Sequence, residues 1–173
     1  MNKAVFMDRD GVINFDPNRY TYKLEEFVLL EGVPEALQLL KNAGYYLVII
    51  TNQAGIAKKI YGHEEVKACH QKMHELTDNA IDGVYYSPYH PQATQSLGRK
   101  PGSLLFEKAM AKFDVDPTQS YMFGDKERDL VPAVTFGFKT IQVFSVHEPT
   151  SKVADYQVKS LLEGAKKIVS GEF

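Results

Sequence analysis

Two carboxylates stand at the end of the first apolar segment of the chain. Residues 4–7 are apolar and lead directly into the stretch "DRDG" (8–11). Because side chains alternate along a strand, Asp8 and Asp10 can face one side while Arg9 faces the other. Two residues of extended chain span about 6.6 Å. One carboxylate could then attack a group held between the two while the other transfers a proton, and we interpret the pair as catalytic.

Chemistry-bearing side chains also follow the later apolar segments. They combine carboxylates, cations and a hydroxyl, which suits a divalent cation together with a phosphate group. Each feature alone could be a charged turn, a helix cap or a surface residue, but all of them stand where successive apolar segments end. The residues are Thr51, Asn52, Gln53, Arg99, Lys100, Asp125, Lys126 and Asp129.

Apolar patterns predict the elements that must position these side chains. Strands alternating with helices are typical of a parallel sheet covered on both faces, so we expect a three-layer, Rossmann-like α/β fold. Ligands of such sheets bind at the carboxyl ends of the strands. Strands are predicted at 3–8, 45–50, 83–87, 120–125 and 139–145, and helices between Pro34 and Gly44, at 63–79, 103–113 and 127–136, and along Val158, Leu161, Leu162, Ala165 and Ile168.

Residues 12–30 have no clean period, and we interpret them as a hairpin-like flap. The connections after Asp8 and after Thr51 are too short to fold as a cap domain. We therefore expect one domain, 1–173, without a cap, and an open site shaped by the flap and by the 88–99 loop.

The composition is that of an ordinary globular protein, with 44% hydrophobic and 24% charged residues among 173. The net charge of -2 gives no reason to expect nucleic acid or a membrane as partner. Cys69 is the single cysteine, which fits a reducing compartment, and no long apolar run precedes Asp8. We expect a cytoplasmic protein, and the sequence leaves its oligomeric state open.

The motifs around Asp8, Thr51, Lys100 and Asp125 resemble the four dispersed motifs of the haloacid dehalogenase superfamily of phosphatases. They occur in the family order from Asp8 to Asp129, although Val12 stands where the family usually has threonine. Within the superfamily, the chain is most similar to the capless group of heptose bisphosphate phosphatases and histidinol phosphate phosphatases. The stretches that carry this similarity are "DRDGVIN", "TNQAGIA", "YYSPYHPQ", "RKP" and "GDKERD".

The resemblance implies a role for each matching residue. Asp8 would be the nucleophile that forms an aspartyl-phosphate, and Asp10 would protonate the leaving alcohol and then activate water. Thr51 and Lys100 would hold the phosphoryl oxygens, and we expect the Lys100 side chain to be exposed, with few core contacts. Mg²⁺ would be bound by the Asp8 carboxylate, the Asp10 main-chain carbonyl and Asp125. The rest of the substrate would contact Asn52, Gln53, Arg99 and Lys126, and Asp16 and Tyr20 of the flap.

One loop departs from the family. Many members of the group carry a zinc site there, built from a cysteine, a histidine and a later Cys-x-Cys. Here Ser87 and Tyr89 occupy the first two places, and "ATQSLG" before Arg99 contains no cysteine. We therefore expect no structural zinc.

Three histidines, His63, His70 and His74, share one stripe of the helix predicted at 63–79. The stretch "HQKMH" superficially matches a zinc-protease helix, but Gln71 stands where that motif has its glutamate. We interpret the stripe as a solvated helix flank.

The sequence therefore predicts a Mg²⁺-dependent phosphomonoesterase that acts on a small phosphorylated metabolite, in the first place a sugar such as a heptose bisphosphate. Histidinol phosphate or a nucleotide remains open as substrate. A phospho-accepting signalling receiver is an alternative of another class, but receivers carry the phosphorylated aspartate on a later strand than the first acidic pair. A catalytically inactive binding module is a third alternative.

Overall fold

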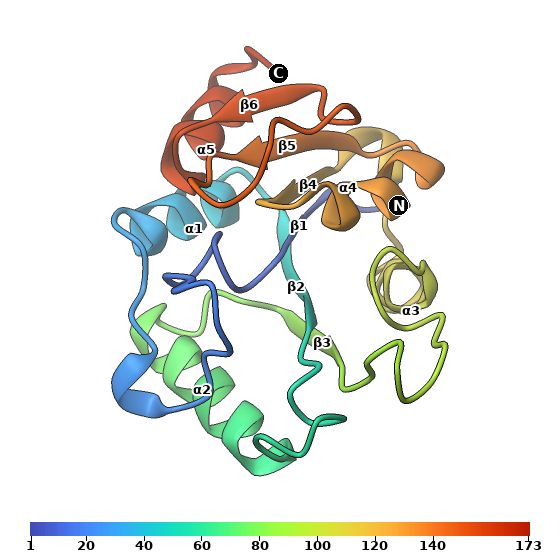
Figure 1. Cartoon of the computed structure of the whole chain (residues 1–173). Coiled ribbons are helices and arrows are strands. Elements are labelled where there is room, and N and C mark those ends of the chain that lie inside the picture. Colours follow the sequence, from blue (N-terminus) through green and yellow to red (C-terminus); the bar gives the residue numbers. More distant parts are fainter.

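The computed structural model describes all residues, 1–173. One sheet of six parallel strands runs through it in the order β3-β2-β1-β4-β5-β6 (Figure 1). The predicted parallel α/β fold is confirmed, and no cap domain is present. The strands are Ala4–Met7 (β1), Tyr46–Asn52 (β2), Gly83–Ser87 (β3), Tyr121–Gly124 (β4), Lys139–Val143 (β5) and Tyr156–Val158 (β6).

Helices cover both faces of the sheet and complete a three-layer arrangement (Figure 1). Helices α1, α2 and α5 pack on one face, and α3 and α4 pack on the other. None of them is long and apolar enough to cross a membrane. The helices are Val33–Asn42 (α1), His63–Leu76 (α2), Leu104–Phe113 (α3), Glu127–Phe136 (α4) and Leu161–Ser170 (α5), with 3₁₀ turns at Leu24–Glu26 (η1) and Pro117–Gln119 (η2).

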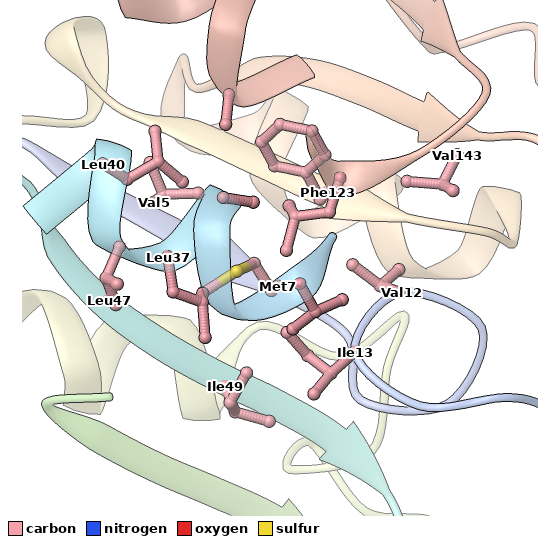
Figure 2. Packing of buried hydrophobic residues seen from close by; sticks show 14 of the residues in the cluster. Val5, Met7, Val12, Ile13, Leu37, Leu40, Leu47, Ile49, Phe123 and Val143 are labelled. Carbon is pink, nitrogen blue, oxygen red and sulfur yellow. The ribbon is translucent and has the colours of Figure 1, made fainter. Parts of the chain in front are cut away.

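The alternation of side chains along β1 divides the core between the two faces. Val5 and Met7 belong to a cluster of 22 buried residues under α1, α2 and α5, part of which is shown in Figure 2. Ala4 and Phe6 belong to a cluster of 12 buried residues under α3 and α4. Each fully buried Val, Leu or Phe contributes about 1.5–3 kcal/mol of transfer free energy. The central strand is therefore fixed from both sides, and so is the position of Asp8 at its end.

Most predicted boundaries differ from the observed ones by one or two residues, and two larger differences have a local reason. The sequence pattern predicts Val158 in the last helix, but Val158 lies in β6. The Ser160 side chain accepts a hydrogen bond from the Glu163 N–H and caps α5 one residue before Leu161. The helix predicted to reach residue 79 ends at Leu76, since Asp78 and Asn79 adopt left-handed φ values of 49° and 55°.

The segment 12–30, which we call the flap, was predicted to be hairpin-like, and only its ends are paired. Its two ends do pair antiparallel, since the Phe15 N–H donates to the Val28 carbonyl at 2.9 Å and the Leu30 N–H donates to Ile13 at 3.0 Å. Between these ends the chain forms η1 and irregular turns instead of a ladder. Val12, Ile13 and Phe27 are buried in the larger core cluster and hold the flap against the sheet.

Candidate active site

The strand order places the first strand at the point where the sheet changes direction of winding. Strand β1 lies between β2 and β4, and open α/β sheets bind ligands in the crevice at such a switch point. The Asp8 N–H donates to the Phe123 carbonyl of β4 at 2.9 Å, so Asp8 lies beside the end of β4. A cavity of about 560 Å³ opens there. The residues singled out in the sequence that line it are Asp8, Asp10, Asp16, Tyr20, Asn52, Gln53, Lys126 and Asp129.

The other predicted site residues lie around this lining. Thr51, Lys100 and Asp125 are each 1% exposed and pack directly behind it. The Thr51 hydroxyl accepts a hydrogen bond from Gln53 Nε2 at 3.0 Å, which leaves its own proton free to be donated. Arg99 is half-buried and donates to the Tyr89 carbonyl at 3.1 Å, outside the lining.

Lys100 is buried, which corrects the expectation of an exposed side chain. Its Nζ lies 2.8 Å from Asp8 Oδ1, 2.9 Å from Asp129 Oδ1 and 2.6 Å from the Ile50 carbonyl oxygen. Burial favours the neutral amine, but the Asp129 and Asp8 carboxylates outweigh it and raise the pKa of Lys100 above its ordinary value. A protonated ammonium therefore stands between two carboxylates at the end of β1.

Asn52 holds this lysine in place through the main chain. Its Nδ2 donates to the Lys100 carbonyl, and its Oδ1 accepts from the Lys100 N–H, both at 3.0 Å. This pair of bonds joins the end of β2 to the loop before α3. The loop thereby delivers Lys100 to the site at the ends of β1, β2 and β4.

Three carboxylates converge where β1 and β4 end. Oxygens of Asp8, Asp125 and Asp129 lie within 4.8 Å of one another, and Asp125 Oδ1 is buried with no hydrogen-bond partner. Burial, together with the Asp8 and Asp129 carboxylates, raises the pKa of Asp125 to about 8. Hard divalent cations bind such oxygen ligands, so the cluster fits Mg²⁺. The sequence left the role of Asp129 open, and the fold adds it to the cluster.

Gly11 makes the close approach of these strand ends possible. Its φ is 85°, a conformation that favours glycine, and a Cβ there would lie 2.7 Å from Asp125 Oδ2. A larger residue would therefore push the turn after Asp10 away from the acidic cluster.

Arg9 does not line the cavity, as the alternation along a strand predicted, but its guanidinium still reaches Asp10. The turn after β1 begins at Asp8, and the fully buried Arg9 guanidinium lies 2.9 Å from Asp10 Oδ1. Burial opposes the charge, but Asp10 outweighs it and raises the pKa of Arg9.

Lys126 connects the flap to the end of β4. Its Nζ lies 2.9 Å from Asp16, 3.3 Å from Asp125 and 4.0 Å from Glu148. Burial opposes the charge, but Asp125 and Asp16 raise the pKa of Lys126 above its ordinary value.

Sequence reasoning missed several residues that line the cavity: four lie on irregular segments outside any motif, and Arg128 lies within the stretch "GDKERD" but was given no role. They are Asn18, Arg19, Thr21, Arg128 and Glu148.

The histidine stripe on α2 is not solvated throughout, which corrects the sequence prediction. His70 is 8% exposed, and its ring packs edge-on against Tyr86 with the centroids 5.7 Å apart. Burial, together with Arg9 and His74, lowers the pKa of His70 to about 3. His70 is therefore a neutral core residue.

Comparisons with known proteins agree with this geometry. The HAD-hydrolase-like family model matches residues 97–163. The D-glycero-beta-D-manno-heptose-1,7-bisphosphate 7-phosphatase of Haemophilus ducreyi is 39% identical over 147 residues, which cover 80% of each chain. The D-glycero-D-manno-heptose-1,7-bisphosphate 7-phosphatase of Chlorobaculum tepidum is 35% identical over 170 residues, covering 90% of this chain and 85% of that protein.

Solved structures share the fold over almost the whole chain. The D,D-heptose 1.7-bisphosphate phosphatase of B. bronchiseptica, complexed with magnesium and phosphate, has a TM-score of 0.88 at 24% identity and covers 98% of this chain and 99% of that one. The D,D-heptose 1,7-bisphosphate phosphatase of Burkholderia Thailandensis has a TM-score of 0.69 at 26% identity, covering 97% and 99%. The chain belongs to the haloacid dehalogenase superfamily and, within it, to the phosphatase family that includes the heptose-1,7-bisphosphate 7-phosphatases.

Proposed function

We propose that the protein is a Mg²⁺-dependent phosphatase that removes one phosphate from a heptose bisphosphate through an aspartyl-phosphate on Asp8. The observation that carries this proposal is the placement of Asp8 in the cavity, 2.8 Å from the buried Lys100 ammonium and beside the acidic cluster. The names of the relatives support the substrate class.

Asp8 and Asp10 divide the chemistry between them. An Asp8 oxygen attacks phosphorus, the bond to the leaving oxygen breaks, and Asp10 gives that oxygen a proton. Asp10 then takes a proton from water, which attacks the aspartyl-phosphate and releases inorganic phosphate. Both residues line the same cavity, so they can reach the same phosphoryl group.

The surrounding residues balance the negative charge of a phosphate that meets a carboxylate. The Lys100 ammonium and the free Thr51 proton can hold phosphoryl oxygens, and Lys100 is already charged before substrate binds. Asp8, Asp125 and Asp129 offer carboxylate oxygens for Mg²⁺, and the family resemblance adds the Asp10 main-chain carbonyl. When bound, the ion would supply further charge neutralisation.

Cationic and polar side chains in the cavity lining support an anionic substrate with a polar body. Arg19, Lys126 and Arg128 line it together with Asp16 and Asn18. No cap encloses it, so selectivity depends on these few contacts. The names of the relatives include both beta and alpha anomers of the heptose bisphosphate, so both anomers are tested as substrates.

Phosphate release from a panel of substrates tests the proposal. The panel comprises both heptose bisphosphate anomers, other sugar phosphates, histidinol phosphate and nucleotides, each with Mg²⁺ and with EDTA. We expect a heptose bisphosphate to give the highest kcat/KM and EDTA to abolish turnover. Preference for histidinol phosphate or a nucleotide would reject the substrate, and a stable phosphoprotein without turnover would favour a receiver.

A further inference from the structure

Side chains from three segments surround the Asp10 carboxylate. Arg9 Nη2 donates to Oδ1 at 2.9 Å and to Oδ2 at 3.0 Å, and Arg9 Nε lies 3.2 Å from Oδ1. Asn14 Nδ2 donates to Oδ1 at 3.0 Å, and Gln53 Nε2 donates to Oδ2 at 3.1 Å. An ionised carboxylate offers about four acceptor positions. These donors therefore fix both the position and the rotation of the carboxyl group.

The two oxygens of Asp10 have different surroundings. The donors that meet at Oδ1, Arg9 and Asn14, are fully buried, and neither lines the cavity. Oδ2 accepts hydrogen bonds from Arg9 Nη2 and from Gln53 Nε2, and Gln53 does line the cavity. Oδ1 is thus an anchor, and Oδ2 is the oxygen placed to exchange a proton with a group in the cavity.

Arg9 is itself held from the flap. Its Nη2 also donates to the Thr21 carbonyl at 2.8 Å, and its guanidinium lies 5.6 Å from the centre of the Phe27 ring. A fully buried cation is costly unless it is paired and hydrogen-bonded, so the side chain has few alternative positions. Arg9 therefore links the flap to Asp10.

Tyr61 holds the Gln53 side chain through a hydrogen bond. Its hydroxyl donates to Gln53 Oε1 at 2.9 Å, which leaves the Gln53 amino group to face Asp10 and Thr51. The Tyr61 ring stacks on Tyr22 of the flap at 4.9 Å between centroids. One hydroxyl thus orients the amide that contacts Asp10 Oδ2.

We propose that Arg9 is a positioning residue for Asp10, which it anchors through Oδ1 so that Oδ2 faces the cavity, and that Tyr61 supports this arrangement through Gln53. The inference rests on the proposed aspartyl-phosphate mechanism, in which Asp10 moves the protons. Neither Arg9 nor Tyr61 needs to touch the substrate for this role.

An aryl phosphate separates the step that needs Asp10 from the step that does not. A phenolate leaves without much help from an acid, so formation of the aspartyl-phosphate should be nearly unaffected by a displaced Asp10. Hydrolysis of that intermediate still needs the base. For Arg9→Met we expect a burst of phenolate release at the wild-type rate, followed by a steady-state rate about 10²-fold lower, as for a catalytic group misplaced by about 1 Å.

Variants of graded severity keep the test decisive. Arg9→Lys retains a cation but not the fork, and should lie between wild type and Arg9→Met. Tyr61→Phe retains the ring and loses one neutral hydrogen bond, so its steady-state rate should fall about five-fold with the burst retained. If Arg9→Met does not fold, Tyr61→Phe and Arg9→Lys decide the question.

Matched controls lie outside the site. Lys41→Met removes a 2.8 Å ion pair with Asp82, and Tyr121→Phe removes a hydroxyl that donates to the Phe173 carbonyl at 3.2 Å. Both should keep wild-type burst and steady-state rates.

Each possible result bears on one proposal or on both. If wild type forms a phosphoenzyme and the Arg9 and Tyr61 variants match the controls, or lose burst and steady state equally, the positioning role is wrong and the proposed function stands. If wild type forms no phosphoenzyme on Asp8, both are wrong.

Discussion

Asp8 and Asp10 are two residues apart, yet they meet different cations. Asp8 shares the Lys100 ammonium with Asp129, whereas Asp10 is bound by the Arg9 guanidinium and by two side-chain amides. If the two carboxylates had a purely structural role, replacing either one would reduce turnover to a similar extent. The covalent mechanism makes the two losses different in kind.

Replacing each acid by asparagine tests this difference. Asp8→Asn removes the attacking oxygen, so neither turnover nor a phosphoenzyme should be detectable. Asp10→Asn keeps the nucleophile and loses proton transfer, a contribution of about 10²- to 10⁴-fold. With an aryl phosphate, label should accumulate on Asp8 of the Asp10 variant, where rapid quench and peptide mapping can locate it. Label on Asp125 or on a histidine would contradict the assignment.

Lys100 should matter for stability as well as for turnover, because it is buried between two carboxylates. Lys100→Met should lower turnover by about 10²- to 10³-fold, as for the loss of one oxyanion donor. It should also lower the free energy of unfolding by about 3–5 kcal/mol, since it leaves Asp8 and Asp129 without their shared cation. Urea titration measures this second effect.

The more exposed pair Lys41–Asp82 is the matched control for that loss. Its side chains are 34% and 22% exposed, so Lys41→Met should cost about 1 kcal/mol or less. Equal destabilisation by the two variants would show that the Lys100 ammonium carries no special electrostatic role.

At the scale of the element, helix α2 contributes a pH dependence through His70. Burial, Arg9 and His74 lower the pKa of His70 to about 3, against 6.5 in the unfolded chain. Between these values the unfolded state binds the extra proton, so the stability contributed by neutral His70 is lost as pH falls below about 6.5. The slope approaches about 1.4 kcal/mol per pH unit.

A neutral replacement isolates this contribution. The free energy of unfolding of His70→Gln, measured between pH 7 and pH 4.5, should fall less steeply than that of wild type. His147→Gln, on the exposed loop after β5, is the control and should keep the wild-type slope. Identical slopes for wild type and His70→Gln would reject the buried, neutral state of His70.

For the whole molecule, the acidic cluster links metal binding to stability. A ligand that binds only the folded state adds about 2.7 kcal/mol at a hundred times its Kd. Mg²⁺ should therefore raise the Tm of wild type, and Asp125→Asn and Asp129→Asn should abolish the rise, whereas Asp82→Asn should retain it. A Tm that does not respond to Mg²⁺ would argue against a metal site at Asp8, Asp125 and Asp129.

Elemental analysis of the purified protein should find no stoichiometric zinc.

The two core clusters share one sheet, and we propose that residues 1–173 unfold as one domain. Ala4 and Phe6 face one cluster while Val5 and Met7 face the other, so neither cluster can form without β1. Far-ultraviolet circular dichroism and tyrosine fluorescence should give coincident urea transitions. Two separate transitions would show that the faces fold independently.

The sequence by itself determined the elements whose signals are local. Strand β3 and helix α4 have their predicted bounds, because apolar runs and the terminating Gly137 are properties of neighbouring residues. Strand β6 was not predicted, because three residues are too few to show a period. The pair Asp8 and Asp10 and the order of the motifs were likewise readable, since each motif occupies a few consecutive positions.

Only the tertiary structure decided how those residues meet. Burial of Lys100 between Asp8 and Asp129 joins positions that lie far apart in the chain, and no local pattern encodes such a contact. The same holds for Arg9: alternation along a strand predicted that its side chain points away from those of Asp8 and Asp10, and did not predict that its buried guanidinium pairs with Asp10. The spacing in the sequence determines which side chains stand at the ends of the strands, whereas the packing of the sheet and the flap determines the partners, exposure and charge of those side chains.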